Sequence, residues 1–139
     1  MRTVITYGTF DLFHVGHLRL LHRARLLGDR LIVGLSTDEF NLHHKDKIAT
    51  IPYVDRLAVL ESLRCVDLVI PETHWEQKRR DIVTHGVTTF VMGDDWLGKF
   101  DSLGDLCEVR YLPRTRNVSS TEIRNHLRDA QGTQMMAVG

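Results

Sequence analysis

The chain has 139 residues, of which 42% are hydrophobic and 26% charged, so it can bury one core but is too short for two ordinary domains. Eighteen basic residues balance eighteen acidic residues, and this neutral balance, with scattered aromatic residues, excludes a nucleic-acid-binding protein with a basic stripe. No apolar run is long enough to span a membrane and no signal segment is evident. We therefore expect a single-domain cytoplasmic protein with no membrane insertion and no nucleic-acid partner.

The amino-terminal half alternates between strand-like and helix-like segments. A strand rich in β-branched residues is predicted over residues 3–7, and an amphipathic helix over residues 15–28, where a glycine ends it. A second strand is predicted over residues 31–35. A long connection, 36–53, then leads to a helix over residues 54–63. Connections of that length usually bind something or are disordered.

The carboxyl-terminal half continues the alternation. Strands are predicted over residues 66–70, 88–92 and 108–112, and a helix over residues 75–85, again ended by a glycine. The stretch 93–106 is a second long connection. Strands that alternate with helices through right-handed crossovers are typical of a parallel sheet.

A last helix is predicted after Ser119, because Ser119 and Glu122 have capping-box spacing. We place the domain at residues 1–129 and expect residues 130–139 to form a flexible tail. The predicted class is a single-domain α/β fold, a doubly wound, Rossmann-like parallel sheet with flanking helices. The ligand crevice of such a fold lies at the carboxyl ends of the strands, so the turn after the first strand should carry chemistry.

That turn, residues 8–17, reads GTFDLFHVGH and places two histidines three residues apart where a helix begins. At this spacing His14 and His17 can face one ligand. Free backbone N–H groups and the positive end of the helix dipole favour anions there, and Gly16 lets a phosphate approach the backbone. The turn therefore predicts a phosphate site. The P-loop and dinucleotide fingerprints are both missing, which disfavours kinases and dehydrogenases.

Two other interpretations of His14 and His17 stay open from these residues alone. They can be ordinary helix-start residues, or two ligands of a zinc ion whose third ligand lies elsewhere. The sequence shows no HExxH pattern and no evident cluster of Cys or Asp as further ligands, which disfavours zinc.

A second constellation, residues 114–121, reads RTRNVSST and joins the last strand to the last helix. The Arg114 guanidinium, several hydroxyls and free N–H groups can hold a triphosphate there and stabilise charge that moves to a leaving pyrophosphate. The alternative is only a well-capped helix, which Ser119 alone would satisfy.

Lys45 and Lys47 lie in the long connection 36–53, within the run HHKDK. Lysines on a mobile loop can offset the repulsion between two anionic substrates and close over both. A solvated basic patch is the alternative.

The stretches GTFDLFHVGH and RTRNVSST together resemble the paired signatures of the cytidylyltransferase family, among the HxGH nucleotidyltransferases. STDEFN, WEQK and FVMGDDW are similar to its glycerol-3-phosphate branch, and the match spans about residues 3 to 125. The resemblance implies transfer of CMP from CTP to sn-glycerol 3-phosphate, giving CDP-glycerol and pyrophosphate, usually in a homodimer. Such products commonly feed polymers of the teichoic acid kind. We expect Mg²⁺ as cofactor, bridging phosphate oxygens with few protein ligands.

The resemblance also implies roles for individual residues. The candidate catalytic residues are His14, His17, Lys47 and Arg114. The candidate nucleotide-binding residues are Thr9, Phe10, Gly16, Arg64, Asp94, Thr115, Arg116, Asn117, Val118, Ser119, Ser120 and Thr121. Lys45 and Lys78 would hold the phosphate of glycerol 3-phosphate, and Asp11 would help place Mg²⁺ or order the turn. Because a phosphate acceptor is already ionised near neutral pH, hydrogen-bond donation by the histidines is favoured over proton abstraction.

Two alternatives stay open within the same chemistry. The acceptor can instead be phosphocholine, phosphoethanolamine or a sugar phosphate, and the nucleotide can be ATP in place of CTP. Arg116 and Asn117 stand where the family often has an acidic residue and a glycine, and Val15 replaces a bulkier aromatic residue. These departures bear on the acceptor and leave the reaction class unchanged. A catalytically silent nucleotide-binding scaffold is the rival of a different class, which the retained charges at the site disfavour.

Overall fold

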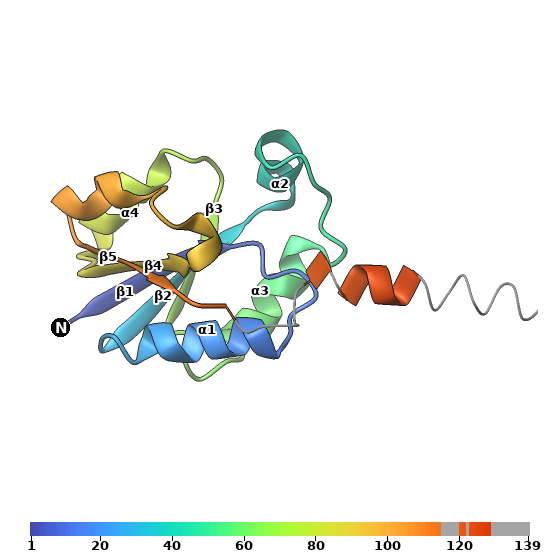
Figure 1. Ribbon diagram of the computed structural model, residues 1–139, viewed down its shortest axis with the longest axis horizontal. Helices are drawn as coiled ribbons and strands as arrows, with labels where there is room; N and C mark the ends of the chain where they lie inside the picture. Colours follow the sequence, from blue (N-terminus) through green and yellow to red (C-terminus); the bar gives the residue numbers. More distant parts are fainter. Residues whose placement is uncertain (115–119, 122, 129–139) are drawn as a thin grey trace, which may run out of the picture.

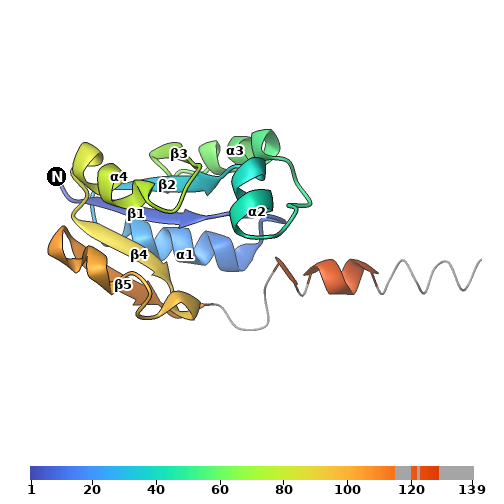
Figure 2. The same ribbon diagram turned by 90° about the horizontal axis from the view of Figure 1, so that it is seen from above.

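The computed structural model describes residues 1–114, 120–121 and 123–128. Five parallel strands form one sheet in the order β3-β2-β1-β4-β5 (Figures 1 and 2). The strands are β1 (Thr3–Gly8), β2 (Arg30–Ser36), β3 (Leu68–Glu72), β4 (Thr89–Gly93) and β5 (Glu108–Leu112). The predicted fold class, a doubly wound parallel sheet with flanking helices, is confirmed.

Helices cover both faces of the sheet. They are α1 (Val15–Arg25), α2 (Asp38–His44), α3 (Tyr53–Glu61) and α4 (Gln77–His85), with two short 3₁₀ helices, η1 (Asp94–Trp96) and η2 (Asp101–Asp105). Figure 1 shows α1 and α3 below the sheet and α4 above it. The described residues after position 119 are helical, as predicted, whereas the Ser119–Glu122 capping box and the predicted tail lie outside the described residues.

The core has one apolar cluster on each face of the sheet. Val4 and Leu31 point to the face that packs against Leu21 of α1 and Leu60 of α3. Alternate residues of the same strands point to the other face, under α4 and η2. Burial on both faces explains why β2 is a nearly continuous apolar run in the sequence and why β1 is buried along almost its whole length, its two threonines included.

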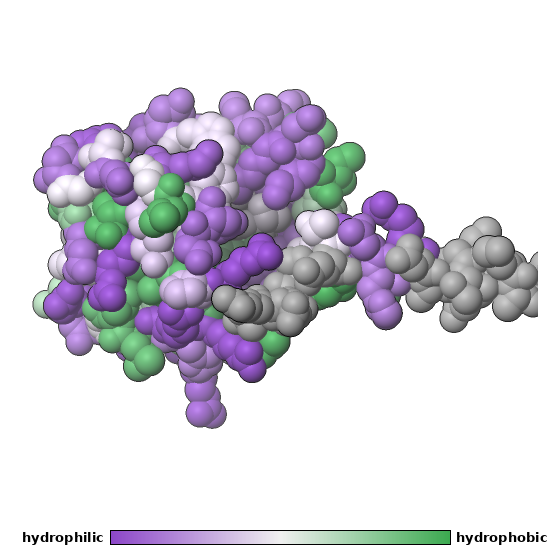
Figure 3. Space-filling model, viewed as in Figure 1, coloured by the Kyte–Doolittle hydropathy of each residue, from purple (hydrophilic) through white to green (hydrophobic). Residues whose placement is uncertain are grey.

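The surface seen in Figure 3 is mostly hydrophilic, with hydrophobic side chains in small, separate patches. Within the part of the chain that the structure describes, no helix is long and apolar enough to cross a membrane.

The elements differ from the sequence prediction chiefly at three places and by one added helix. Helix α1 ends at Arg25, three residues before the predicted glycine stop, and β3 begins and ends two residues later than predicted. Helix α4 begins at Gln77, because the Gln77 side chain folds back and accepts hydrogen bonds from the N–H groups of Thr73 and His74. Helix α2 lies in the predicted long connection, where the Thr37 side chain caps it by accepting the Phe40 N–H.

Strand β1 lies at the centre of the sheet, and the chain places β2 on one side of it and β4 on the other. Between β1 and β4 the direction of winding reverses, and α/β folds bind their ligands at the carboxyl end of such a switch point. The turn after β1, predicted as a phosphate site, therefore opens directly onto the crevice.

Candidate active site

A cavity of about 330 Å³ opens at the carboxyl ends of the strands. Gly8, Glu72 and Gly93, the last residues of β1, β3 and β4, line it, as does Pro113 just after β5. The turn after β1 and the start of the last helix also contribute lining residues. So does the loop 45–52 between α2 and α3, called the lysine loop here because it carries Lys45 and Lys47. Segments far apart in the sequence therefore meet around one space that is large enough for a small ligand.

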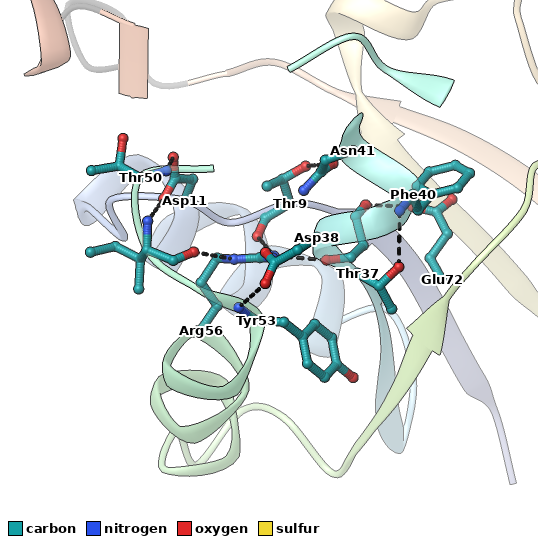
Figure 4. A network of polar contacts seen from close by, with 12 residues as sticks. Thr9, Asp11, Thr37, Asp38, Phe40, Asn41, Thr50, Tyr53, Arg56 and Glu72 are labelled. Atoms are coloured by element: carbon teal, nitrogen blue, oxygen red, sulfur yellow. Dashed lines mark hydrogen bonds and ion pairs between the residues drawn. The ribbon is translucent and has the colours of Figure 1, made fainter. Parts of the chain in front are cut away.

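The Asp11 side chain, 3% exposed, holds the turn after β1 in place through several hydrogen bonds. Its carboxylate accepts the N–H groups of Leu12, Thr50 (2.8 Å) and Ile51 (2.9 Å) and forms an ion pair with Arg124 of the last helix. Figure 4 shows Asp11 beside Thr50. Burial alone would raise the pKa of Asp11, but these hydrogen bonds outweigh it and lower the pKa below its ordinary value. Because the chain itself engages both carboxylate oxygens, the arrangement favours the ordering role of Asp11 over a metal-ligand role.

The same turn holds two non-glycine residues in the left-handed region. Phe10 has φ of 51° and Leu12 has φ of 48°, and such conformations persist only where the surroundings enforce them. Here the Asp11 hydrogen bonds, together with a Ser120 hydroxyl that donates to the Asp11 carbonyl, supply that constraint. A Cβ at Gly8 would lie 2.9 Å from the Phe10 ring, so this turn also requires glycine at its start.

His14 and His17 form a hydrogen-bonded, stacked pair at the start of α1. His14 Nδ1 accepts the Gly16 N–H at 3.0 Å, and His17 Nδ1 accepts the His14 N–H at 3.2 Å. The ring centroids lie 3.9 Å apart. Because each Nδ1 is an acceptor, a neutral ring carries its proton on Nε2. Burial first, and then His14, lower the pKa of His17 to about 4, so His17 is a neutral Nε2–H donor near neutral pH.

Two lysines share one buried carboxylate on the opposite side of the cavity. Glu72 Oε2 lies 2.7 Å from Lys78 Nζ, and Glu72 Oε1 lies 3.7 Å from Lys45 Nζ. Ser36 Oγ joins the two, because it donates to Glu72 Oε1 at 2.7 Å and accepts from Lys45 Nζ at 2.9 Å. Burial lowers the pKa of Lys45 to about 8, against the attraction of Glu72, which raises it. The cluster carries one surplus positive charge that can receive an anion.

Aromatic rings surround these ammonium groups. Lys78 Nζ lies 4.7 Å from the ring centroid of Tyr7 and 4.8 Å from that of Trp75. Lys45 Nζ lies 5.6 Å from Trp75 and 5.3 Å from Phe40. Contacts of this kind favour a cation and hold both lysines beside the cavity.

Arg56, 2% exposed, ties together three segments around the site (Figure 4). Its guanidinium donates to the carbonyls of Ile51, Thr9 and Ser36 at 2.8 Å each, and to Asp38 Oδ1 at 2.7 Å. These acceptors belong to the lysine loop, the turn after β1 and the end of β2 with its following helix. Arg56 therefore fixes the loops that carry the binding groups to one another.

Most of the predicted site residues within the described part of the chain line this cavity. They are Thr9, Phe10, Asp11, His14, Gly16, His17, Lys45, Lys47, Lys78, Arg114, Ser120 and Thr121. The predicted residues Thr115, Arg116, Asn117, Val118 and Ser119 lie outside the described residues.

Two predicted residues lie away from the lining. Arg64 is exposed in the turn between α3 and β3, at the amino ends of the strands, and does not line this cavity. Asp94 is exposed at the start of η1, and its neighbour Asp95 lines the cavity instead.

Sequence reasoning missed Glu72, Trp75, Arg56 and Arg124 as site residues. Glu72 ends a strand at the carboxyl edge of the sheet, which is a usable signal once the strand is recognised. Arg56 and Arg124 lie in helices, and nothing in their local sequence predicts that their side chains reach the turn after β1.

The described residues contain no group of three or more His, Cys, Asp or Glu side chains that could hold a metal ion. Mg²⁺ bound mainly through substrate phosphates and water would still be compatible with this donor set, since it requires few protein ligands. Three carboxylates in the described part of the chain line the cavity, and because the chain itself engages those of Asp11 and Glu72, Asp95 would be the one to help hold it.

The cytidylyltransferase-like family matches residues 5–126 of the chain. Glycerol-3-phosphate cytidylyltransferase from Bacillus subtilis (strain 168) is 58% identical over 127 residues, which cover 91% of this chain and 98% of that protein. The enzyme of the same name from Staphylococcus aureus (strain NCTC 8325 / PS 47) is 56% identical, over 91% of this chain and 96% of its own. The crystal structure of a lipopolysaccharide core biosynthesis protein from Thermoplasma volcanium superposes with a TM-score of 0.68 over 83% of this chain and 98% of its own, at 24% identity, which shows the shared fold.

Proposed function

We propose a reaction on the premise that this chain belongs to the cytidylyltransferase-like family, among the glycerol-3-phosphate cytidylyltransferases. In that reaction a phosphate oxygen of sn-glycerol 3-phosphate attacks the α-phosphorus of CTP. The bond from that phosphorus to the bridging oxygen breaks, giving CDP-glycerol and pyrophosphate. The observation that carries the proposal is one cavity with the stacked pair of His14 and the neutral donor His17 on one side and a lysine pair on the other.

The turn after β1 is the proposed CTP side of the cavity. His17, with its proton on Nε2, donates a hydrogen bond to phosphate oxygens, and His14 acts beside it in the stacked pair. Arg114 and Lys47 add positive charge where charge moves to the leaving pyrophosphate. No protein nucleophile and no general base is needed, because the acceptor phosphate is already ionised and alignment and charge neutralisation lower the barrier.

The lysine pair is the proposed acceptor side. Lys78 and Lys45 present ammonium groups to the acceptor phosphate, and Trp75 packs beside both of them. These ammonium groups already cover the aromatic rings that would otherwise attract a quaternary ammonium. A phosphocholine or phosphoethanolamine acceptor would also bring its own positive charge to a positive cluster. This charge arrangement favours an acceptor with an uncharged body, such as glycerol 3-phosphate.

Three further features belong to the proposal. Mg²⁺ would supply charge neutralisation on the phosphates of CTP, with Asp95 as the residue placed to assist. The working enzyme would be a homodimer in the cytoplasm. Its product would feed a polymer of the teichoic acid kind.

Release of pyrophosphate is the measurement that tests the reaction. With CTP and Mg²⁺, release is expected with glycerol 3-phosphate and at most about a hundredth of that rate with phosphocholine, phosphoethanolamine or sugar phosphates. ATP in place of CTP should give little release. Faster turnover with another acceptor would retain the chemistry and reject glycerol 3-phosphate, and no release with any pair would favour the scaffold alternative.

Substitution of Lys78 by methionine is expected to weaken acceptor binding selectively. Methionine fills a similar volume but removes the charge, so the KM for glycerol 3-phosphate should rise about tenfold to a hundredfold. The KM for CTP should change by less than about twofold, because the nucleotide is held on the other side of the cavity. Steady-state kinetics with each substrate varied in turn give both values.

The matched control is Arg80→Met, which removes an exposed charge from the same helix and should leave both KM values unchanged. A larger effect of Lys78→Met on CTP than on glycerol 3-phosphate would move Lys78 to the nucleotide site.

A further inference from the structure

Glu72 is a nearly fully buried carboxylate, 1% exposed, on the lining of the cavity. Its two oxygens have separate partners: Oε2 accepts from Lys78 at 2.7 Å, whereas Oε1 accepts from Ser36 at 2.7 Å and lies 3.7 Å from the Lys45 ammonium. The reaction proposed above assigns it no role. A buried carboxylate in contact with both proposed acceptor-binding lysines requires an explanation.

The charges at this cluster are unequal. Lys45 faces one negative group, Glu72, and two positive groups, Lys47 and Lys78. Buried ammonium groups without a counter-charge lose their protons or move toward water. Without Glu72, the pKa of Lys45 would therefore fall further, and neither lysine would be fixed in the absence of the acceptor.

Other roles for Glu72 fit the geometry less well. A general base would need an oxygen available to a substrate proton, but both oxygens are engaged and the acceptor phosphate needs no base. A metal-ligand role lacks support, because the described residues provide no group of acidic, His or Cys side chains around it.

We propose that Glu72 is a positioning residue of the acceptor site, which holds the ammonium groups of Lys45 and Lys78 in place until the acceptor phosphate binds them. The inference rests on the function proposed above and deepens it. When the phosphate enters, its oxygens take over part of the hydrogen bonding from the Glu72 carboxylate. Ser36 keeps the carboxylate aligned during this exchange, through the hydroxyl that it shares between Glu72 and Lys45.

The test compares Glu72→Gln with the wild type from pH 7 to pH 9.5. At pH 8 the KM for glycerol 3-phosphate is expected to rise at least about tenfold, with the KM for CTP within about twofold. A lysine binds phosphate only while protonated, so acceptor affinity is lost as pH rises through the lysine pKa. Because Glu72 raises the pKa of Lys45, its neutralisation should move that loss to lower pH by about one unit or more.

Two further variants make the result specific. Glu76→Gln is the control, since the Glu76 side chain is 85% exposed on the same segment and should change neither KM nor its pH midpoint. Glu72→Asp keeps the negative charge, so the pH at which acceptor affinity is lost should return close to the wild-type value even if the KM stays raised. An ion pair that only stabilises the fold would not separate the pH midpoint from the KM in this way.

An unchanged pH midpoint in Glu72→Gln, or equal effects on both substrates, would overturn the proposal. If Glu72→Gln does not fold, Ser36→Ala takes its place in the test. The Ser36→Ala variant removes the hydroxyl between Lys45 and Glu72 and should shift the pH midpoint of acceptor binding in the same direction. A wild-type enzyme that uses another phosphorylated acceptor would correct the proposed function, and the same variants measured with that acceptor would still test Glu72.

Discussion

Replacement of His17 by alanine is expected to lower kcat for CMP transfer by about a hundredfold or more. In the proposed mechanism the neutral ring donates from Nε2 toward charge that develops on the phosphates, and alanine removes that donor. The His17 side chain also accepts the His14 N–H at the start of α1, so the variant should lose about 1 kcal/mol of stability without unfolding. Single-turnover kinetics with saturating CTP, together with urea unfolding, separate the two effects.

His22→Ala is the matched control, because His22 is an exposed histidine in the last turn of the same helix. It should leave kcat unchanged, and turnover of His17→Ala within about threefold of wild type would remove His17 from the mechanism.

The pH dependence of stability gives a second check on His17. Burial lowers the pKa of His17 to about 4 from the ordinary value of 6.5, so its contribution is full above pH 6.5 and is lost as pH falls through 4. In His17→Gln the free energy of unfolding should therefore fall less steeply between pH 6.5 and pH 4 than in the wild type.

The fold could be predicted because its signals are local. The apolar runs of β1 and β2 are buried on both faces, and the helix after β1 follows a turn whose glycines and histidines have a defined spacing. Helix α2 also carried a local signal that was overlooked, since Thr37 precedes Asp38 and Glu39 in a favourable first turn. The start of α4 depended instead on the side chain of Gln77, which competes with the helix for backbone N–H groups.

The candidate site could be predicted only in part, for a physical reason. His14, His17 and Gly16 lie within one turn, so their spacing alone predicts a shared ligand. The contacts of Glu72 with Lys45 and of Arg124 with Asp11 join distant segments, and only the packed sheet and loops bring them together. Arg64 was assigned by resemblance, and the structure places it at the opposite end of the strands.

Substitution of Arg56 by methionine is expected to reduce the free energy of unfolding by about 3–5 kcal/mol. Methionine fills much of the space but donates no hydrogen bond, so the carbonyls of Thr9, Ser36 and Ile51 lose a buried partner. Asp38 loses its ion pair as well, although its exposure of 46% makes that part of the cost small. Equilibrium urea unfolding of the two proteins measures the difference.

Arg79→Met is the control, because Arg79 also pairs with an aspartate at 2.6 Å but both side chains are at least half exposed. An exposed pair of this kind contributes little to stability, so the two variants share a lost arginine–aspartate pair and differ in burial. If both variants lose the same small amount of unfolding free energy, the buried hydrogen bonds of Arg56 are not what fixes the loops.

If only Arg56→Met is strongly destabilised, its KM should rise for both substrates under conditions where the variant is still folded. The Thr9 and Ser36 carbonyls belong to the proposed nucleotide and acceptor sides of the cavity, so a loss of Arg56 should loosen both sides, whereas Lys78→Met should affect one.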